Sequence, residues 1–379
     1  MTIHWCGTGL SAIPGLRELI SAGHPVTVWN RTLRKAQKAV GYLTQKIKVF
    51  NPNALKNELQ PGDIIVSMLP GDWHVPLAEM ALSKGAHFIS SSYISPEMRA
   101  LDERAKTAGL ALVNEVGLDP GIDHLMAHYL VEDYRAAATY NADNTLSFIS
   151  YCGGIPKIPN AFRYKFSWSP LGVLKALASP SRSLRNFEIF DGARPWTALS
   201  SYEAPLQIPE TFEVYPNRDS LPFIQQYKFD PDWKVKDFVR GSLRLNGWAD
   251  AWSEIFREIE SLQGAEGERQ MQKMSQEFWA KHAYGNDDPD RVVLCVSLKA
   301  TLGETLRWHK TYVMDAWGDA SGTAMARLVS IPVSLAVTAV LKDHIGAGVS
   351  AAPSDPKLVA AWLGRVGNLA QRLHIVDHT

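Results

Sequence analysis

The sequence predicts an α/β protein, in which an N-terminal, Rossmann-like doubly wound parallel sheet precedes a second, mixed α/β domain with a helical insertion. Short apolar segments alternate with amphipathic segments up to about Asn114, and a glycine-rich turn follows the first apolar segment. After about Asp123 the segments become longer and richer in aromatic residues. A chain of 379 residues is long enough for two domains, because one continuous core rarely grows beyond roughly 250–300 residues.

Six apolar runs are expected to form the strands of the first sheet. They are residues 3–6, 26–29, 47–50, 64–68, 87–89 and 110–113. Strands that alternate with helices indicate a parallel sheet, and such a sheet binds its ligands beyond the carboxyl ends of the strands. The segments that follow the strands are therefore the candidate site regions: 7–12, 30–32, 67–74, 90–93 and 115–123.

The second part of the chain is expected to form a mixed, largely antiparallel sheet. Its expected strands are residues 146–151, 164–168, 292–298 and 305–314, and a polar helical hairpin is expected between Trp248 and His282, with a break near Gly264 and Gly267. The apolar run 328–341 is shorter than the roughly 20 residues of a membrane-spanning helix and is predicted to be a buried core helix. Apolar residues at helical spacing continue in the tail at 357–373.

These patterns predict three parts of the chain. Residues 1–123 form a dinucleotide-binding domain. Residues 124–345 form a domain that binds the substrate and makes a homodimer through its sheet, with the insertion at about 246–290. Residues 346–379 form a C-terminal helical segment that packs back on the body of the protein.

Composition excludes several classes of protein. Lys and Arg together number 39, as do Asp and Glu, so no charge bias predicts nucleic acid or an anionic membrane as a partner. The three cysteines, Cys6, Cys152 and Cys295, form no zinc-ligand pattern, so no metal is expected and a reducing compartment is favoured. The N-terminus becomes glycine-rich at Gly7 before any long apolar segment, so no signal peptide is expected and the predicted location is cytoplasmic.

The first strand runs into the segment Gly7-Thr8-Gly9-Leu10-Ser11-Ala12. This is a Gly-x-Gly-x-x-Ala pattern between a strand and a helix, and it predicts a dinucleotide site. Gly7 permits the tight turn, and Gly9 allows the backbone to approach the pyrophosphate. Leu10 and Ser11 lead into the following helix, whose N-terminus stabilises the negative charge of the pyrophosphate. Pro14 is expected just beyond the first helical turn, where it would cost a hydrogen bond or kink the helix.

The end of the second strand favours NADP(H) over NAD(H). An NAD site usually places an acidic residue there, whereas this chain has Asn30, Arg31 and Thr32, and Arg31 with Thr32 offers a cation and a hydroxyl to a 2′-phosphate. In the alternative interpretation Arg31 is a solvated residue and both cofactors are accepted. Further cofactor contacts are predicted at the other strand ends, at Ser67, Leu69, Pro70, Ser91, Val116 and Gly117.

The segment 114–124, Asn-Glu-Val-Gly-Leu-Asp-Pro-Gly-Ile-Asp-His, resembles the signature of the saccharopine dehydrogenases of the L-glutamate-forming type. The resemblance covers most of the chain, and its other segments are 91–96, 150–154, 164–169, 215–220 and 239–244. It implies an NADP-dependent enzyme of lysine metabolism that interconverts saccharopine with L-glutamate and 2-aminoadipate 6-semialdehyde. Hydride transfer through an imine requires groups that exchange protons with an amine, and cations for the substrate carboxylates.

The resemblance implies Tyr93, Asp119 and Cys152 as candidate catalytic residues. Tyr93 either orients the amine and relays a proton or packs against the nicotinamide ribose. Asp119 either binds the substrate nitrogen or caps the following helix. Cys152 is expected to position the substrate rather than to act as a nucleophile, and Asp123, His74 and His124 are interpreted as structural.

Saccharopine has three carboxylates, so its site is expected to contain cations. The candidate substrate-binding residues are Ser92, Lys165, Trp168, Arg218 and Arg240. Among the cations Arg218 and Arg240 are favoured, and Lys165 and Arg244 are the weaker choices. Surface charge and aromatic packing are the alternative interpretations of these residues.

Some positions depart from the family pattern, namely 156–159, Phe162, Arg163 and Leu171, and they leave other substrates open. The alternatives are a related amine or imine oxidoreductase, such as lysine 6-dehydrogenase or a carboxynorspermidine-type dehydrogenase, and a non-catalytic NADP-binding sensor.

Overall fold

The structure is a computed structural model that describes residues 1–285 and 288–379. Its contacts divide the chain into two compact units. Unit 1 contains residues 1–125 and 326–366, and unit 2 contains residues 126–325 and 367–379.

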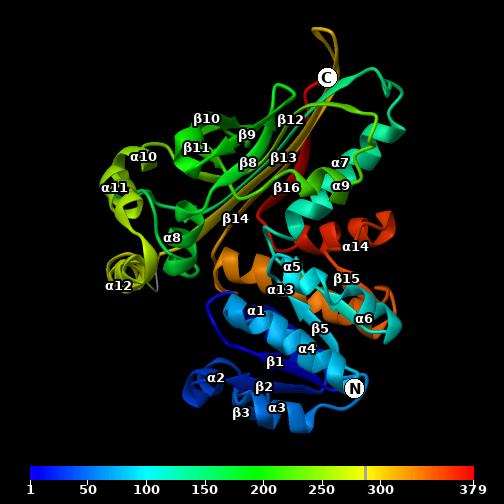
Figure 1. Cartoon of the computed structure of the whole chain (residues 1–379), viewed down its shortest axis with the longest axis vertical. Helices are drawn as coiled ribbons and strands as arrows, with labels where there is room; N and C mark the ends of the chain where they lie inside the picture. Colours follow the sequence, from blue (N-terminus) through cyan, green and yellow to red (C-terminus); the bar gives the residue numbers. More distant parts are fainter. Residues whose placement is uncertain (286–287) are drawn as a thin grey trace. The chain divides into compact units, whose positions relative to one another are not determined.

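Unit 1 contains a parallel sheet with the strand order β15-β6-β5-β4-β1-β2-β3 (Figure 1). Its strands are β1 (Ile3–Cys6), β2 (Val26–Asn30), β3 (Ile47–Val49), β4 (Ile64–Ser67), β5 (His87–Ser90), β6 (Ala111–Val113) and β15 (Gly348–Ser350). The six expected strands and the doubly wound parallel sheet are confirmed. The order reverses between β4 and β1, and such a switch point is where a doubly wound sheet binds its ligand.

Helices cover both faces of this sheet. They are α1 (Ile13–Ser21), α2 (Leu33–Val40), α3 (Pro52–Glu58), the 3-10 turn η1 (Gly71–Trp73), α4 (His74–Lys84), α5 (Pro96–Arg99), α6 (Asp102–Thr107), the start of α7 (Ile122–Ala136), most of α13 (Ala324–Leu341) and all but the last residue of α14 (Pro356–Gly367). Because helices lie on both faces, every residue of β1, β4 and β6 is buried, as is usual in parallel sheets.

The glycine-rich loop leads into α1, which packs closely against α13. A Cβ atom on Gly15 would lie 2.0 Å from the carbonyl oxygen of Ser330, and the Gly15 N–H donates to Ser330 Oγ at 2.8 Å. The expectation for Pro14 was wrong. The helix begins at Ile13, so Pro14 lies in the first turn, where its N–H would have no intrahelical acceptor.

Helix α13 confirms the prediction of a buried core helix at residues 328–341. Among the described residues it is the one helix long and apolar enough to cross a membrane, with a mean hydropathy of 1.9, but 78% of it is buried inside the protein. Its burial accounts for its apolar composition.

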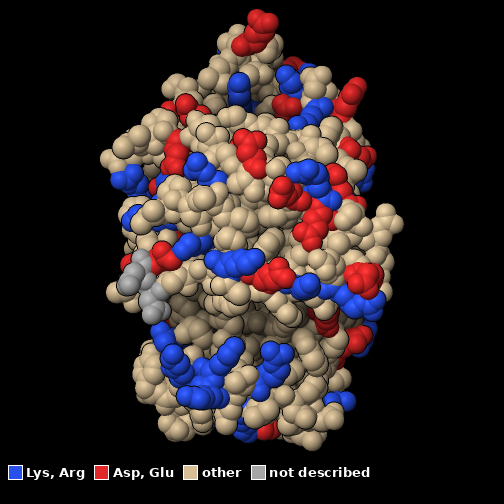
Figure 2. All heavy atoms as spheres, turned by 90° about the vertical axis from the view of Figure 1, so that its left-hand side faces the viewer, with Lys and Arg blue, Asp and Glu red and all other residues tan. Residues whose placement is uncertain are grey.

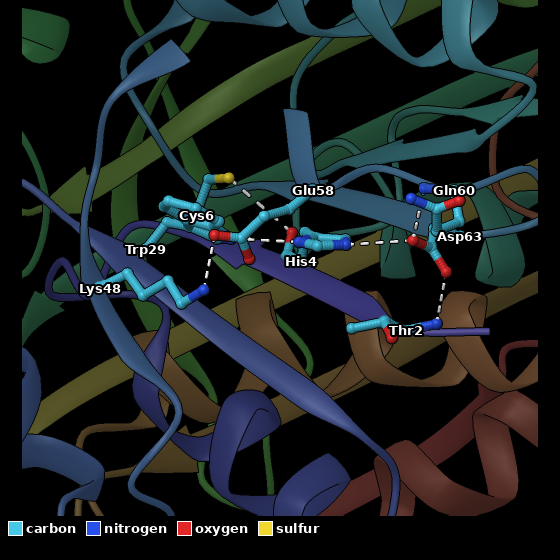
Figure 3. Close-up of polar contacts among 8 residues, drawn as sticks. All are labelled: Thr2, His4, Cys6, Trp29, Lys48, Glu58, Gln60 and Asp63. Carbon is cyan, nitrogen blue, oxygen red and sulfur yellow. Dashed lines mark hydrogen bonds and ion pairs between the residues drawn. The ribbon is translucent and has the colours of Figure 1, made fainter. Parts of the chain in front are cut away.

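A buried polar network joins the starts of β1 and β4 (Figure 3). Nε2 of His4 lies 3.2 Å from Oδ2 of Asp63, and the indole N–H of Trp29 donates to His4 Nδ1 at 3.2 Å. Asp63 also accepts the backbone N–H of Thr2 at 2.6 Å and that of Gln60 at 2.9 Å. The network satisfies polar groups at the amino edge of the sheet, the edge opposite to the one that binds ligands in such folds.

Unit 2 is built on a larger sheet with the order β10-β11-β12-β7-β13-β14-β16, and β8 and β9 lie off this path (Figure 1). The strands are β7 (Thr145–Pro156), β8 (Ser181–Arg185), β9 (Glu188–Gly192), β10 (Ser200–Ala204), β11 (Glu210–Pro216), β12 (Lys234–Leu245), β13 (Asp290–Leu302), β14 (Thr305–Trp317) and β16 (Arg372–Asp377). Only β12 and β7 pair in parallel among the described strands of this sheet. The expected mixed, largely antiparallel sheet is confirmed.

The helices of unit 2 are the rest of α7, α8 (Pro170–Ala178), η2 (Pro195–Ala198), α9 (Pro222–Gln226), α10 (Trp248–Ala251), α11 (Ser253–Ser261) and α12 (Gly264–His282). The predicted hairpin is present as α11 and α12. The expected strand at 164–168 was wrong, because apart from one isolated bridge at Phe166 this segment has no strand pairing. Its alternation arises because Tyr164 and Phe166 insert into the aromatic core between α8 and the hairpin.

The expected domain boundaries differ from those of the structure. Residues 326–345 belong to unit 1, because α13 packs on α1. The tail after residue 346 is not wholly helical, because it also supplies β15 to the first sheet and β16 to the second. Helical periodicity locates α13 and α14 but does not show which sheet they cover.

Candidate functional site

The glycine-rich loop at the end of β1 has room for a ligand at one glycine and none at the other. Gly7 has a φ of +104°, and a Cβ atom there would lie 2.6 Å from the carbonyl oxygen of Met68. A Cβ atom on Gly9 would meet nothing within 4 Å. Leu10 is 51% exposed and Ser11 is half-buried at the entrance to α1. A tight turn followed by open backbone fits the pyrophosphate of a dinucleotide.

The loop is braced by Asn30 at the end of β2. Asn30 Oδ1 accepts the Thr8 N–H at 3.1 Å, and its Nδ2 donates to the Thr32 carbonyl at 2.8 Å. The side chain predicted to contact the cofactor therefore already holds the loop in place. In the part of the chain that the structure describes, the buried hydroxyl of Thr8 has no hydrogen-bond partner, as expected where a ligand supplies one.

Basic residues gather where β2 leads into α2. Arg31, Thr32, Arg34 and Lys35 are exposed, and no ion pair of these three cations is found among the described residues. Figure 2 shows lysine and arginine side chains collected on the face of the molecule that carries α2. This arrangement suits a 2′-phosphate, because a phosphate dianion next to several unpaired cations gains charge-assisted hydrogen bonds.

Reversing the charge of Arg31 is expected to remove the preference for NADP(H). Arg31→Asp should weaken NADPH binding by about 30-fold, since the carboxylate repels the 2′-phosphate, and should change NADH binding by less than about 3-fold. Fluorescence titration of the two reduced cofactors measures both constants. Lys38→Asp, the same charge change in the last turn of α2, is the matched control. An equal loss for NADPH and NADH in Arg31→Asp would contradict the assignment of Arg31.

A chain of hydrogen bonds connects the ends of β4 and β5. Ser67 Oγ lies 2.9 Å from Nδ1 of His74, and Ser92 Oγ lies 2.8 Å from its Nε2. Burial lowers the pKa of His74 to about 4, so the ring is neutral near pH 7 and can donate at one nitrogen and accept at the other. Ser92, predicted to bind substrate, thus has its hydroxyl on His74, and the structural interpretation of His74 agrees with these contacts.

Acid is expected to destabilise unit 1 through His74. The pKa of this ring is about 4 in the fold and 6.5 in an unfolded chain, so the stabilisation is present above pH 6.5 and is lost as the pH falls towards 4. The full loss is on the order of 3 kcal/mol. Urea unfolding at pH 7.5 and 4.5 should show a smaller loss for His74→Gln than for the wild type. Equal losses would show that another group governs acid unfolding.

The remaining predicted cofactor residues lie on the loops that follow β4, β5 and β6. Leu69 and Ser91 are half-buried and Pro70 is exposed. Val116 is fully buried, so its side chain is part of the core and a cofactor would meet its backbone. A Cβ atom on Gly117 would lie 3.0 Å from Ser91 Cβ, so glycine lets these two loops approach each other.

Two of the predicted catalytic residues of unit 1 are brought together. The Tyr93 hydroxyl donates to Oδ1 of Asp119 at 3.0 Å, although the residues are 26 positions apart. Both side chains are half-buried. Helix α7 begins three residues after Asp119, at Ile122. A carboxylate that accepts from a phenol can receive a proton from a substrate nitrogen or pass one through the hydroxyl.

The third predicted catalytic residue, Cys152, lies in unit 2 on β7 and is 8% exposed. It pairs in parallel with Ser242 of β12. A Cβ atom on Gly153 would lie 2.4 Å from the carbonyl oxygen of Leu243. The glycine after Cys152 is therefore required by the packing of unit 2, which gives the sequence pattern a structural cause in addition to the expected approach of a ligand.

Arg244, the weaker choice from the sequence, is the cation of unit 2 with the most distinctive surroundings. It is 6% exposed, and its guanidinium carbon lies 4.9 Å from the ring centre of Tyr164, 5.4 Å from that of Tyr215 and 5.6 Å from that of Trp248. One N–H donates to the Leu243 carbonyl at 3.0 Å. No carboxylate in the described part of the chain forms an ion pair with it.

Three buried polar atoms at and around Arg244 also lack a hydrogen-bond partner among the described residues. They are Nε of Arg244, the hydroxyl of Tyr164 and the indole nitrogen of Trp248. Buried polar groups are normally satisfied, and a buried cation is normally paired. A ligand carboxylate would supply the missing charge and acceptors. The residues next to Arg244 in the sequence do not show that three aromatic rings surround it, so its distinctive surroundings are visible only in the structure.

The other predicted substrate residues have varied surroundings. Arg240 is 3% exposed and lies 3.9 Å from the ring centre of Phe223, whereas Arg218 is exposed and has a φ of 58°. Lys165 forms an ion pair with Asp288. Trp168 packs against Gly172 of α8, where a Cβ atom would lie 2.5 Å from its ring, which supports the packing interpretation of that residue.

The departures from the family pattern are partly explained by packing. Phe162 stacks on His282 with ring centres 3.7 Å apart, and its carbonyl accepts the Trp252 indole N–H at 3.0 Å. Leu171 packs on the same aromatic core. Both residues therefore serve the helical insertion. No group of three metal-ligating side chains occurs in the described ranges 1–285 and 288–379.

Comparison with protein families gives matches over both parts of the chain. Residues 4–113 match the saccharopine dehydrogenase NADP binding domain, and residues 117–368 match the saccharopine dehydrogenase C-terminal domain. The chain belongs to the saccharopine dehydrogenase family. The NADP binding domain is the part that contains the glycine-rich loop and the basic residues after β2.

Individual relatives support the same family. The chain is 35% identical over 249 residues to the NADP-dependent, L-glutamate-forming saccharopine dehydrogenase of Pyricularia oryzae. The aligned region covers 64% of this chain and 54% of that protein. The Saccharomyces cerevisiae enzyme of the same name is 32% identical over 259 residues, with 64% and 55% covered. This chain therefore spans about half the length of these two relatives.

Solved structures show the same fold. The apo L-glutamate-forming saccharopine dehydrogenase of Saccharomyces cerevisiae superimposes with a TM-score of 0.80 at 24% identity and covers 100% of both chains. A homospermidine synthase of Legionella pneumophila has a TM-score of 0.64 at 11% identity, with 99% of this chain and 91% of that chain covered. At these identities the likeness concerns the fold alone.

Proposed function

We propose that this protein is an NADP-dependent oxidoreductase that interconverts saccharopine with L-glutamate and 2-aminoadipate 6-semialdehyde. The observation that carries the proposal is the buried guanidinium of Arg244, which lies among three aromatic rings without a carboxylate partner in the described residues. Such a cation fits a substrate with several carboxylates. The names of the fungal relatives agree with this substrate.

NADP(H), when bound, supplies the hydride acceptor or donor. The residues of unit 1 that fit it are the open backbone at Gly9, the orphaned hydroxyl of Thr8 and the cations Arg31, Arg34 and Lys35. These groups bind and orient the dinucleotide through its phosphates. They do not take part in proton transfer.

Proton transfer is assigned to Asp119 and Tyr93. In the direction of saccharopine oxidation, Asp119 accepts a proton from the secondary ammonium group, so that the freed nitrogen lone pair can assist loss of hydride from the adjacent carbon. Water then adds to the resulting imine, and the carbinolamine collapses to the aldehyde and the amine of glutamate. The Tyr93 hydroxyl is hydrogen-bonded to Asp119. It can relay a proton between the carbinolamine oxygen and the nitrogen that leaves as the amine of glutamate.

The test is the absorbance of the reduced nicotinamide, with purified protein, saccharopine and either NADP or NAD. Lysine and spermidine-type amines serve as parallel substrates. Reduction of NADP by saccharopine alone supports the proposal. Turnover of another amine only would indicate a related amine or imine oxidoreductase. NADPH binding without turnover of any substrate would indicate the sensor.

We also propose a homodimer formed through the sheet of unit 2 and a location in the reducing cytoplasm. Support for the dimer is the pairing potential of edge strands such as β16. Support for the location is that Cys6, Cys152 and Cys295 are all buried thiols. Light scattering of the purified protein and fractionation of cells test these two points.

A further inference from the structure

We propose that Glu115 is a positioning residue that aligns Tyr93 with Asp119 and acts through His124 and Asp123. This inference rests on the proposed function, because alignment of the pair matters only if the pair transfers protons. Glu115, Asp123 and His124 lie within the segment 114–124, which carries the family resemblance. The sequence alone indicates a structural role for Asp123 and His124.

Glu115 holds the backbone on both sides of Tyr93. Its own N–H donates to the carbonyl of Ser92 at 3.0 Å, and its Oε1 accepts the N–H of Ile94 at 3.0 Å. The backbone on either side of Tyr93 is therefore held by two hydrogen bonds to one residue on a neighbouring loop.

The second carboxylate oxygen of Glu115 reaches the loop that carries Asp119. Oε2 lies 3.1 Å from Nε2 of His124, and Nδ1 of that ring lies 3.3 Å from Oδ2 of Asp123. Oδ1 of Asp123 accepts the Gly121 N–H at 2.7 Å. The chain of contacts thus runs from the neighbours of Tyr93 to the residue two positions after Asp119.

The loop itself is tightly folded, so that a shift at one point moves the rest. The Gly117 N–H donates to the Pro120 carbonyl at 2.9 Å, and the Ile122 N–H donates to the Gly117 carbonyl at 3.0 Å. A Cβ atom on Gly121 would lie 2.2 Å from the Gly117 carbonyl oxygen. Asp119 is carried between these fixed points.

The network is charged as well as buried. Asp123 and His124 are 0% exposed and Glu115 is 3% exposed. Burial opposes the charge on His124, but the carboxylates of Asp123 and Glu115 raise its pKa to about 9. Both carboxylates face the ring, so the imidazolium is held between one group from the loop after β6 and one from α7.

The backbone of Glu115 supports a functional reason for this arrangement. Its φ is 54°, in the left-handed region that side chains other than glycine and asparagine adopt at a cost. Local strain of this kind is common at functional sites, where the surrounding contacts keep it in place. Here those contacts are the bonds to Ile94 and His124.

The experiment compares Glu115→Asp and Glu115→Gln in the full chain. Asp keeps the charge but is one methylene too short to reach both Ile94 and His124, whereas Gln keeps the length and one acceptor oxygen. We expect Glu115→Asp to lower kcat at least 10-fold, since small misplacements of reacting groups cost up to about 100-fold. Glu115→Gln should stay within about 3-fold of the wild type, because its oxygen can still accept the Ile94 N–H while its amide N–H donates to Nε2 of a neutral His124 ring whose Nδ1 still donates to Asp123. The Kd of NADPH should not change in either variant.

His4→Asn is the matched control, because it also removes one partner of a buried contact between a histidine and a carboxylate in unit 1. It should lower the melting temperature without lowering kcat. A loss of kcat in Glu115→Asp no larger than that in His4→Asn would overturn the proposal.

A crystal structure of Glu115→Asp decides the question without any turnover. We expect the hydrogen bond between Tyr93 and Asp119 to be broken, and an intact bond would overturn the positioning role. Inactivity of the wild type towards saccharopine would instead defeat the proposed function, and the crystal structure would still decide the role of Glu115.

Discussion

Asp119→Asn is expected to lower kcat for saccharopine oxidation by about 100-fold to 10,000-fold, the usual range for loss of a positioned general acid or base. The amide can still accept the Tyr93 hydroxyl but cannot take a proton from the secondary ammonium group. The Kd of NADPH should be unchanged, because asparagine has the size of aspartate and can keep the contact with Tyr93, so the backbone of the loop after β6 stays in place. Stopped-flow measurement of nicotinamide reduction separates this chemical step from product release.

Tyr93→Phe distinguishes the two interpretations of Tyr93. If its hydroxyl relays protons to Asp119, kcat should fall about 10-fold or more. If only the ring is needed, for packing on the nicotinamide ribose, kcat should be unchanged because the ring is kept. Asp119→Asn with wild-type kcat and a lowered melting temperature would instead assign Asp119 to the cap of α7.

Arg244→Met is expected to raise the KM for saccharopine about 100-fold, which corresponds to ~2.7 kcal/mol of lost binding. Met approximates the length of the side chain but removes the charge and the donors. The free protein should not lose stability in thermal unfolding, because a buried cation without a carboxylate partner costs free energy that an apolar side chain does not. Substrate binding should therefore weaken while the melting temperature of the free protein stays the same or rises.

Arg291→Met is the matched control in the same unit. Arg291 is also largely buried, but it pairs with Asp315 at 2.7 and 2.9 Å and with Glu210 at 2.7 Å. Its removal leaves the buried Asp315 unpaired and should cost about 3 kcal/mol of stability. Steady-state kinetics and thermal unfolding of both variants are the measurements. A destabilised Arg244→Met with an unchanged KM would make Arg244 a structural residue.

The parallel sheet was predictable because its signals are local. Each apolar run forms a strand, and the turn at Gly7 requires a residue that tolerates a φ of +104°. The strand β15 was missed because it has three residues, Gly348–Ser350, and its place beside β6 depends on contacts more than 200 positions away. The segment 164–168 was misread because aromatic residues that alternate in sequence can face a helical cluster as well as a sheet.

The candidate site shows the same distinction. The family motif contains Asp119, and its relation to Tyr93 follows only when β5 and β6 place their loops side by side. From the sequence, Arg218 and Arg240 were favoured over Arg244, although all three are arginines in segments that match the family. Arg218 is exposed, whereas Arg240 and Arg244 are both buried, and Arg244 differs from Arg240 in lying among the rings of Tyr164, Tyr215 and Trp248. These surroundings come from residues far apart in the chain and cannot be inferred from the residues next to each arginine.

Local sequence was enough to define the strands of unit 1, the glycine-rich turn, the basic residues after β2 and the family, because these depend on periodicity, backbone conformation and residue identity. Packing between distant segments was needed to show which sheet α13 covers, that Asn30 braces the loop, and that Glu115 joins the loops of Tyr93 and Asp119. The same holds for Arg244 as the buried cation of unit 2. These features depend on distances and burial between residues far apart in the chain, which are fixed when the side chains pack.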